Sequence, residues 1–276
     1  MYTLNCRGTL LTIERPLVMG IINITPDSFY AGSRVRNENA MLDRVRQMIS
    51  DGATIIDIGG QSTRPGSQEV NAQEELDRVI HAIELIHSQF PETILSIDTY
   101  YSEVALHALE AGASIVNDVS GGMMDPHMLN KVAAFKAPFI CMHMKGTPQT
   151  MQSYTDYGDL ESEIIDYFIE RIAACRTAGI VDIILDPGFG FSKTIDQNFQ
   201  LLKNSALLNS FELPWLAGLS RKGMIYRTLK IDADASLNGT TVLNTIALQQ
   251  GASVLRVHDV KEAVQAVNLM YKLQRG

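Results

Sequence analysis

Short apolar runs alternate along this chain with longer segments of mixed polarity. The short runs are rich in β-branched residues, which is typical of buried strands. In the longer segments, apolar residues recur about every three to four positions, which is typical of amphipathic helices. Asp125-Pro126 has the features of a helix start and Gly179 those of a helix end. The pattern predicts eight strands, at residues 17–23, 54–59, 93–98, 114–119, 138–143, 182–186, 215–220 and 253–258.

Regular alternation of strand and helix predicts the α/β class with a parallel sheet, because parallel neighbours need a crossover connection. Eight such repeats within 276 residues fit a closed (β/α)8 barrel, the TIM barrel. Residues 1–16 alternate in polarity around Arg7-Gly8 and predict an N-terminal β-hairpin that closes the bottom of the barrel. No linker-like stretch divides the chain, so we expect residues 1–276 to form a single domain.

Polar residues gather at the carboxyl-terminal ends of the predicted strands, which in a barrel open to one mouth. Strand alternation tests this, because only every second side chain points inward. The inward sets change from apolar or small to polar along each strand, as in Val254, Arg256 and His258, with Met142 as the exception. The polar residues expected at the mouth are Asn23, the turn at 59–64, Asp98, Asn117 with Asp118, His143, Asp186, Ser220, Arg221, Lys222, Arg256 and His258. A single residue such as Asn117 also suits a local backbone contact, but buried polar groups gathered at one rim favour a ligand site.

Composition and net charge exclude some classes of binding partner for this protein. A hydrophobic content of 46% excludes a disordered chain, and 31 acidic against 23 basic residues give a net charge of −8. We therefore expect no nucleic acid and no membrane among the principal partners. No apolar run approaches the ~18 residues of a membrane span, and the N-terminus lacks the pattern of a signal peptide. The chain has no C-x-x-C pair, so we interpret Cys6, Cys141 and Cys175 as reduced and expect a cytoplasmic protein.

Three long segments follow predicted strands, at 24–37, 60–72 and 144–158, and we interpret them as lids over the mouth. The rim already holds Lys222 and Arg256. The three segments and the neighbouring turn bring further basic residues toward it: Arg34, Arg36, Arg64, Lys145 and Arg221. Positive charge in an acidic protein points to an anionic substrate, with phosphate as the natural group. Arg36 and Lys145 also suit the role of solvated loop charges. Deeper in the barrel, Asp98, Asn117 and Asp186 could accept hydrogen bonds from a flat heterocycle.

Two long motifs resemble the signatures of dihydropteroate synthases, at residues 19–29 (MGIINITPDSF) and 59–66 (GGQSTRPG). Further matches follow in the family's order at residues 96–99, 116–118, 186–191, 220–222 and 256–259, so the resemblance spans residues 17–259. It implies an enzyme of folate biosynthesis. This transferase would condense 6-hydroxymethyl-7,8-dihydropterin diphosphate with 4-aminobenzoate, releasing pyrophosphate and 7,8-dihydropteroate.

The resemblance also implies roles for individual residues. Residues in catalytic positions are Asp98, Lys222, Arg256 and Arg64. Residues in pterin-binding positions are Asp98, Asn117, Asp186, Lys222, the pocket wall Met142 and the stacking residue Arg256. Asn23 matches a Mg²⁺ ligand, while Thr63, Arg256 and His258 match contacts to the diphosphate. Residues around the 4-aminobenzoate pocket, which is also the expected sulfonamide target, are Phe29, Arg64, Pro65, Phe191, Lys222 and Ser220.

Some expectations rest on less of the sequence. The resemblance implies a homodimer that forms through the last helices. An apolar stripe there could form the dimer contact or could equally pack against the barrel; it contains Val260, Ala263, Val264, Val267 and Tyr271. The first lid departs from the family, with Ala31 where a carboxylate is common. Two alternatives stay open here: a methyltetrahydrofolate-corrinoid type methyltransferase domain, which has no diphosphate to hold, and a non-catalytic pterin-binding protein, which would lack the lids or the Mg²⁺ residue.

Overall fold

The computed structural model describes the backbone of residues 1–24, 34–61 and 70–275, and the side chains of residues 1–24, 37–61 and 70–273. Eight parallel strands form one sheet in the order β8-β7-β6-β5-β4-β3-β10-β9. A parallel bridge between Leu185 and Trp215 joins the two ends of this sheet, so the barrel closes. The strands are β3 (Leu17–Asn23), β4 (Ile55–Gly59), β5 (Ile94–Asp98), β6 (Ile115–Asp118), β7 (Phe139–Met142), β8 (Ile183–Asp186), β9 (Leu216–Ala217) and β10 (Val254–Val257). All lie within the predicted runs, and β9 is shorter than predicted.

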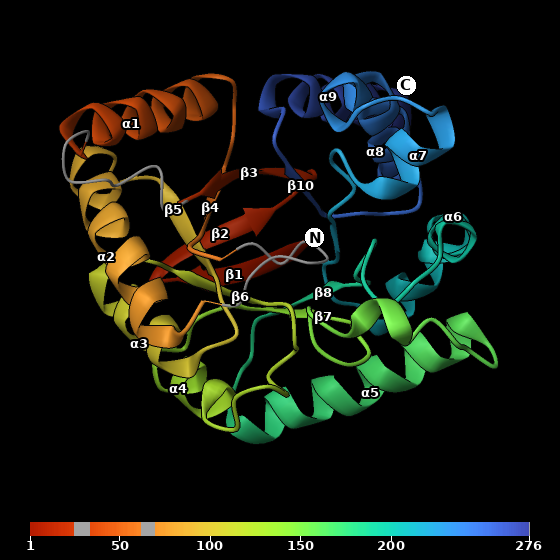
Figure 1. Ribbon diagram of the computed structural model, residues 1–276, viewed down its shortest axis with the longest axis horizontal. Coiled ribbons are helices and arrows are strands. Elements are labelled where there is room, and N and C mark those ends of the chain that lie inside the picture. Colours follow the sequence, from red (N-terminus) through yellow and green to blue (C-terminus); the bar gives the residue numbers. More distant parts are fainter. Residues whose placement is uncertain (25–33, 62–69, 276) are drawn as a thin grey trace.

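Helices ring the strands (Figure 1). They are α1 (Arg34–Ser50), α2 (Ala72–Gln89), α3 (Ser102–Ala111), α4 (Met128–Ala134), α5 (Leu160–Ala178), α6 (Ile195–Asn204), α7 (Gly223–Leu229), α8 (Leu237–Gln249) and α9 (Val260–Arg275). Short 3-10 helices are η2 (Met151–Ser153), η3 (Ser205–Phe211) and η4 (Ala233–Ser236). Gly179 ends α5 with φ 98°, as predicted. The helix start predicted at Asp125 is wrong: α4 begins at Met128. Asp125 precedes it in a turn, where its carboxylate accepts hydrogen bonds from the backbone N–H groups of Ser102 and His127.

An N-terminal antiparallel hairpin, β1 (Tyr2–Cys6) and β2 (Thr9–Ile13), lies across the middle of the ring (Figure 1). Its buried residues Leu4, Cys6 and Ile13 pack against the first inward side chains of the barrel strands. These barrel partners are Leu17, Met19, Ile55, Ile115, Ile140, Ile184, Leu216 and Val254. They mark the amino-terminal ends of the strands, so the hairpin closes the end of the barrel opposite the mouth. The predicted TIM barrel with its N-terminal hairpin is confirmed.

A second, larger core lies between the barrel and the helices. Cys141 and Cys175 belong to it, and all three cysteines are buried and unbonded. The α9 stripe also packs here, with Val260, Ala263 and Val267 buried. The apolar stripe of α9, which the sequence offered either for a dimer contact or for barrel packing, is therefore mostly used in packing against the barrel. No helix in the described parts of the chain is long and apolar enough to cross a membrane.

Candidate active site

The carboxyl ends of several barrel strands surround one pocket at the mouth. It is lined by Asp98, Asn117, Val119, Met142, Asp186, Phe191, Gly218, Lys222 and Arg256. Strand alternation predicted this convergence: Asn117 and Asp186 each lie two residues beyond a core residue on the inward face, and Asp98 lies four residues beyond Ile94 on the same face. The cavity between these side chains measures ≈ 20 Å³, which is room for about one water. A bicyclic ligand therefore requires the long side chains of Lys222 and Arg256 to move aside.

Arg256 lies between two carboxylates. Its Nε donates to Asp57 Oδ2 at 2.6 Å and its Nη2 to Asp98 Oδ2 at 2.5 Å. Burial alone would lower the pKa of Arg256, but Asp57 and Asp98 outweigh it and raise the pKa above its usual value. Burial raises the pKa of Asp98 in spite of the opposing charge of Arg256. Arg256 therefore stays charged, and Asp98 takes up a proton more easily than a free carboxylate does.

Asp186 and Lys222 form the other charged side of the pocket. Asp186 Oδ1 accepts from the backbone N–H of Gly188 at 2.8 Å. Gly188 has φ +69°, and a Cβ there would lie 2.1 Å from the carbonyl oxygen of His143, so only glycine fits this turn. Burial raises the pKa of Asp186, while the Lys222 charge opposes the rise. Burial lowers the pKa of Lys222 to about 8, against the attraction of Asp186.

Aromatic and amide groups complete the wall. Lys222 Nζ donates to the carbonyl oxygen of Phe189 and lies 4.9 Å from the centre of the Phe191 ring. Asn117 Nδ2 donates to Asp57 Oδ2 at 3.2 Å, which leaves its carbonyl oxygen to accept another bond. Met142 packs with Phe191 and Val119 in a small apolar cluster. The pocket thus combines a flat apolar side with carboxylate and amide oxygens, as a polar heterocycle requires.

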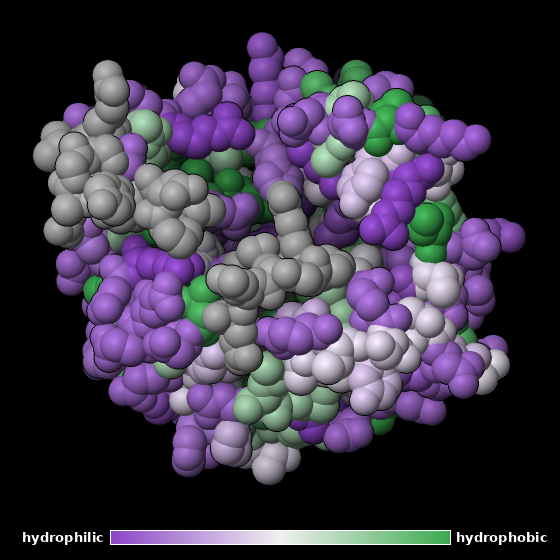
Figure 2. Space-filling view, viewed as in Figure 1, coloured by the Kyte–Doolittle hydropathy of each residue, from purple (hydrophilic) through white to green (hydrophobic). Residues whose placement is uncertain are grey.

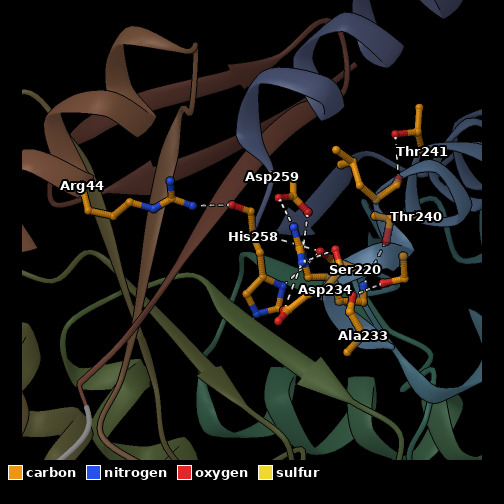
Figure 3. A network of polar contacts seen from close by, with 11 residues as sticks. Arg44, Ser220, Ala233, Asp234, Thr240, Thr241, His258 and Asp259 are labelled. Carbon is orange, nitrogen blue, oxygen red and sulfur yellow. Dashed lines mark hydrogen bonds and ion pairs between the residues drawn. The ribbon is translucent and has the colours of Figure 1, made fainter. Parts of the chain in front are cut away.

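A second group of polar contacts lies beside the pocket, between the turns that follow β9 and β10 (Figure 3). Ser220 Oγ lies 3.0 Å from His258 Nδ1, and Arg44 on α1 donates to the carbonyl oxygen of His258 at 2.7 Å. Arg221 makes two hydrogen bonds to Asp259, at 2.9 and 2.8 Å. His258 therefore lies next to Arg256 on a turn that is fixed from both sides.

Mg²⁺, the metal that the resemblance implies, needs oxygen ligands. Asn23 is the last residue of β3, and its exposed side chain lies beside Gly59 at the mouth. Within residues 1–24, 37–61 and 70–273, no cluster of three or more His, Cys, Asp or Glu could hold a metal. Mg²⁺ commonly takes only one or two protein ligands and completes its shell with waters and substrate phosphates. The single amide oxygen of Asn23 fits that kind of site.

The pocket as described does not include every predicted site residue. Phe29, Thr63, Arg64 and Pro65 lie outside the described residues, as does Ala31, and so do the side chains of Arg34 and Arg36. Arg221 was expected to face the mouth, but it is bound to Asp259. Lys145 was expected either at the mouth or as a solvated loop charge, and it forms an ion pair with Glu163 on α5. Among the described residues, the positive charge at the mouth therefore comes from Lys222 and Arg256.

Two buried residues of the site were missed from the sequence. Asp57, fully buried on β4, anchors both Arg256 and Asn117. It lies on the inward face between Ile55 and Gly59, so the same alternation could have found it. Lys193 lies behind the pocket, and its Nζ contacts His143 Nδ1 at 3.0 Å and the carbonyl oxygens of Gly188 and Phe191. Burial lowers its pKa to about 7, and no sequence periodicity points to it.

Comparisons with known proteins agree with this geometry. A family model described as "Pterin binding enzyme" matches residues 19–258. The dihydropteroate synthase of Escherichia coli (strain K12) is 44% identical over 269 residues, which cover 96% of this chain and 94% of that protein. The chain belongs to the dihydropteroate synthase family. It is thus an enzyme of folate biosynthesis, and this identity decides against the methyltransferase and the non-catalytic alternatives.

Solved dihydropteroate synthases share the whole fold. The Yersinia pestis enzyme, in complex with a sulfonamide drug, has a TM-score of 0.93 and 42% identity, with 100% of both chains covered. The Xanthomonas albilineans enzyme with 4-aminobenzoic acid has a TM-score of 0.91 and 39% identity, covering 99% of this chain and 98% of that one. Dihydropteroate synthases thus keep this barrel with ligands bound.

Proposed function

We propose that this dihydropteroate synthase binds the pterin ring in the pocket of Asp98, Asn117 and Asp186. The observation that carries this proposal is the convergence of these three acceptors with Arg256 and Lys222 around one pocket. Asp186 can accept two N–H bonds from a 2-amino pyrimidine edge, as a carboxylate does in bidentate pairs. Arg256 offers a planar guanidinium that can stack on the ring, and Met142 closes the pocket wall. Phe191 and Lys222 would face 4-aminobenzoate, together with Phe29, Arg64 and Pro65.

The diphosphate would lie at the outer end of this pocket, toward Arg256 and His258, with Thr63 contributing from the second lid. Guanidinium and imidazole N–H groups are good donors to phosphate oxygens. Asn23 would hold Mg²⁺ there together with the diphosphate, and the bound ion would neutralise part of the leaving group's charge. This arrangement stabilises negative charge where it develops when the C–O bond breaks.

The reaction needs little proton transfer. The bond between the pterin methylene carbon and the diphosphate oxygen breaks, and the diphosphate leaves with the electron pair. The methylene becomes cationic, and Asp98 stabilises it electrostatically from below the ring. The arylamine nitrogen then donates its lone pair to the carbon, and its surplus proton passes to water. No strong general base is required, because an arylamine is already a nucleophile.

Pyrophosphate release tests this function directly. We expect purified enzyme to release pyrophosphate only when pterin diphosphate, 4-aminobenzoate and Mg²⁺ are all present. Chelation of Mg²⁺ with EDTA should stop the release, and added Mg²⁺ should restore it. Release without 4-aminobenzoate at the full rate would instead indicate a pterin diphosphate hydrolase.

Sulfonamides should compete with 4-aminobenzoate, because both present an aniline to the same pocket, as the complex of the Yersinia pestis enzyme suggests. Rates measured over a grid of the two concentrations should converge at saturating 4-aminobenzoate. Inhibition that 4-aminobenzoate does not relieve would contradict the pocket assignment.

We also propose that the chain forms one domain that assembles as a homodimer. Large apolar side chains are exposed over α7, α8 and α9 (Figure 2, upper right), among them Leu229, Val242, Leu269 and Leu273. Exposed apolar side chains on neighbouring helices are suited to an interaction site. Free, buried cysteines support a cytoplasmic location.

The double substitution Leu269→Glu and Leu273→Glu should convert a dimer to a monomer, because it places charge on that face. Sedimentation equilibrium of both proteins measures this. The control is Ile169→Glu, which changes another exposed apolar residue, on α5, and should leave the mass unchanged. A monomeric wild-type enzyme would overturn the proposal.

A further inference from the structure

Ser220 is engaged with His258 rather than with the pocket. Its Oγ lies 3.0 Å from His258 Nδ1 and accepts from the backbone N–H of His258 at 3.2 Å. Ser220 is buried and His258 is partly exposed. The sequence led us to expect Ser220 beside 4-aminobenzoate, whereas both of its contacts go to a residue assigned to the diphosphate end (Figure 3). This hydroxyl is therefore placed to orient His258.

The Ser220 hydroxyl can select one tautomer of His258 by donating to it. A hydroxyl has one O–H donor, and the backbone N–H of His258 already donates to one of the Oγ lone pairs. The O–H can then donate to Nδ1, which must be unprotonated to accept it. In a neutral imidazole the proton then lies on Nε2. Nε2–H is a hydrogen-bond donor, as contact with a diphosphate oxygen requires.

The two turns are also locked to each other. Arg221, next to Ser220, makes its paired hydrogen bonds to Asp259, next to His258. The backbone N–H of Arg221 donates to Thr240 Oγ1 on α8 at 3.1 Å, and Arg44 holds the carbonyl of His258 from α1. Arg221 has φ 55°, a strained value for a residue with a side chain, so its conformation depends on these contacts. The ion pair thus keeps Ser220 and His258 within bonding distance.

We infer that Ser220 is a positioning residue for diphosphate recognition, holding His258 in its Nε2–H tautomer, with the Arg221–Asp259 ion pair clamping the two turns. The inference rests on the proposed function, because it assumes that His258 contacts the diphosphate. It reassigns Ser220 from the 4-aminobenzoate end of the site to the diphosphate end.

Binding measurements separate the two ends. In Ser220→Ala, we expect the Kd for pterin diphosphate to rise by about 5- to 10-fold, which is the usual effect of one lost hydrogen bond. The Kd for the alcohol, 6-hydroxymethyl-7,8-dihydropterin, and the KM for 4-aminobenzoate should stay within about twofold. The matched control is Ser205→Ala, which removes another buried hydroxyl, bonded to the Leu202 carbonyl away from the mouth, and should change none of these constants.

Two outcomes would overturn the inference. One is a rise in the KM for 4-aminobenzoate with unchanged pterin diphosphate binding, which would place Ser220 at the other end of the site. The other is additivity in a double-mutant cycle of Ser220→Ala with His258→Gln, because a residue that acts through His258 should have no effect once His258 is replaced. If the wild-type enzyme binds pterin diphosphate no better than the alcohol, the proposed diphosphate site itself fails.

The tautomer can be read in the wild-type enzyme, so the test does not depend on a variant that folds. Nitrogen NMR of ¹⁵N-histidine-labelled protein, with the His258 signals identified by their loss in His258→Gln, distinguishes protonated from unprotonated ring nitrogens. We expect Nδ1 unprotonated and Nε2 protonated in the neutral ring. The opposite assignment would refute the inference.

Discussion

Replacement of Asp186 with alanine should lower kcat/KM for pterin diphosphate by at least about 100-fold, equivalent to ~2.7 kcal/mol. Asp186 is a buried acceptor at the floor of the pocket, held in place by the Gly188 N–H. A lost charge-assisted hydrogen bond costs ~1.5 to 3 kcal/mol, and this carboxylate can accept two such bonds from the pterin. Steady-state kinetics of Asp186→Ala, with circular dichroism to verify the fold, measures the effect.

The control for Asp186 is Asp166→Ala, which removes an exposed carboxylate on α5 and should leave the kinetics unchanged. Near-normal turnover in a folded Asp186→Ala enzyme would contradict the placement of the pterin.

Lys222→Ala should also lower kcat/KM by at least about 100-fold, because it removes a partly buried cation that interacts with both Asp186 and the Phe191 ring. The pH profile tests the role of its charge. Burial lowers the pKa of Lys222 to about 8, so the side chain is charged below that pH and loses its proton above it. Wild-type kcat/KM should therefore fall as the pH rises through about 8.

Lys222→Arg keeps a charge at all these pH values, so its residual activity should show no such fall. Lys203→Ala, which changes an exposed lysine at the end of α6, is the control and should behave as wild type. A basic limb that survives unchanged in Lys222→Arg would assign the titration to another group.

The barrel and the floor of its pocket were predictable because strand geometry has a strict period. Side chains two residues apart share a face, so Ile184 in the core places Asp186 in the pocket. The same rule covers Asp57, which anchors Arg256. It was missed because it lies in the middle of β4, whereas the other polar residues gather at the strand ends.

The turns were less predictable because they have no period. Arg221 and Lys222 are adjacent basic residues, and nothing in the sequence says which one faces the pocket. The positive φ of Arg221 turns its side chain to Asp259, while Lys222 reaches Phe189 across the pocket. Lys193 was missed for a related reason, since its partners are backbone carbonyls brought close only by the fold.

The most direct measurement is a crystal structure of the enzyme with a pterin diphosphate bound in the absence of 4-aminobenzoate. We predict the ring between Arg256 and Met142, with its amino pyrimidine edge on Asp186 and its diphosphate toward His258 and Asn23. A pterin found outside the barrel mouth, or one with Asp98, Asn117 and Asp186 making no contact to it, would contradict the account.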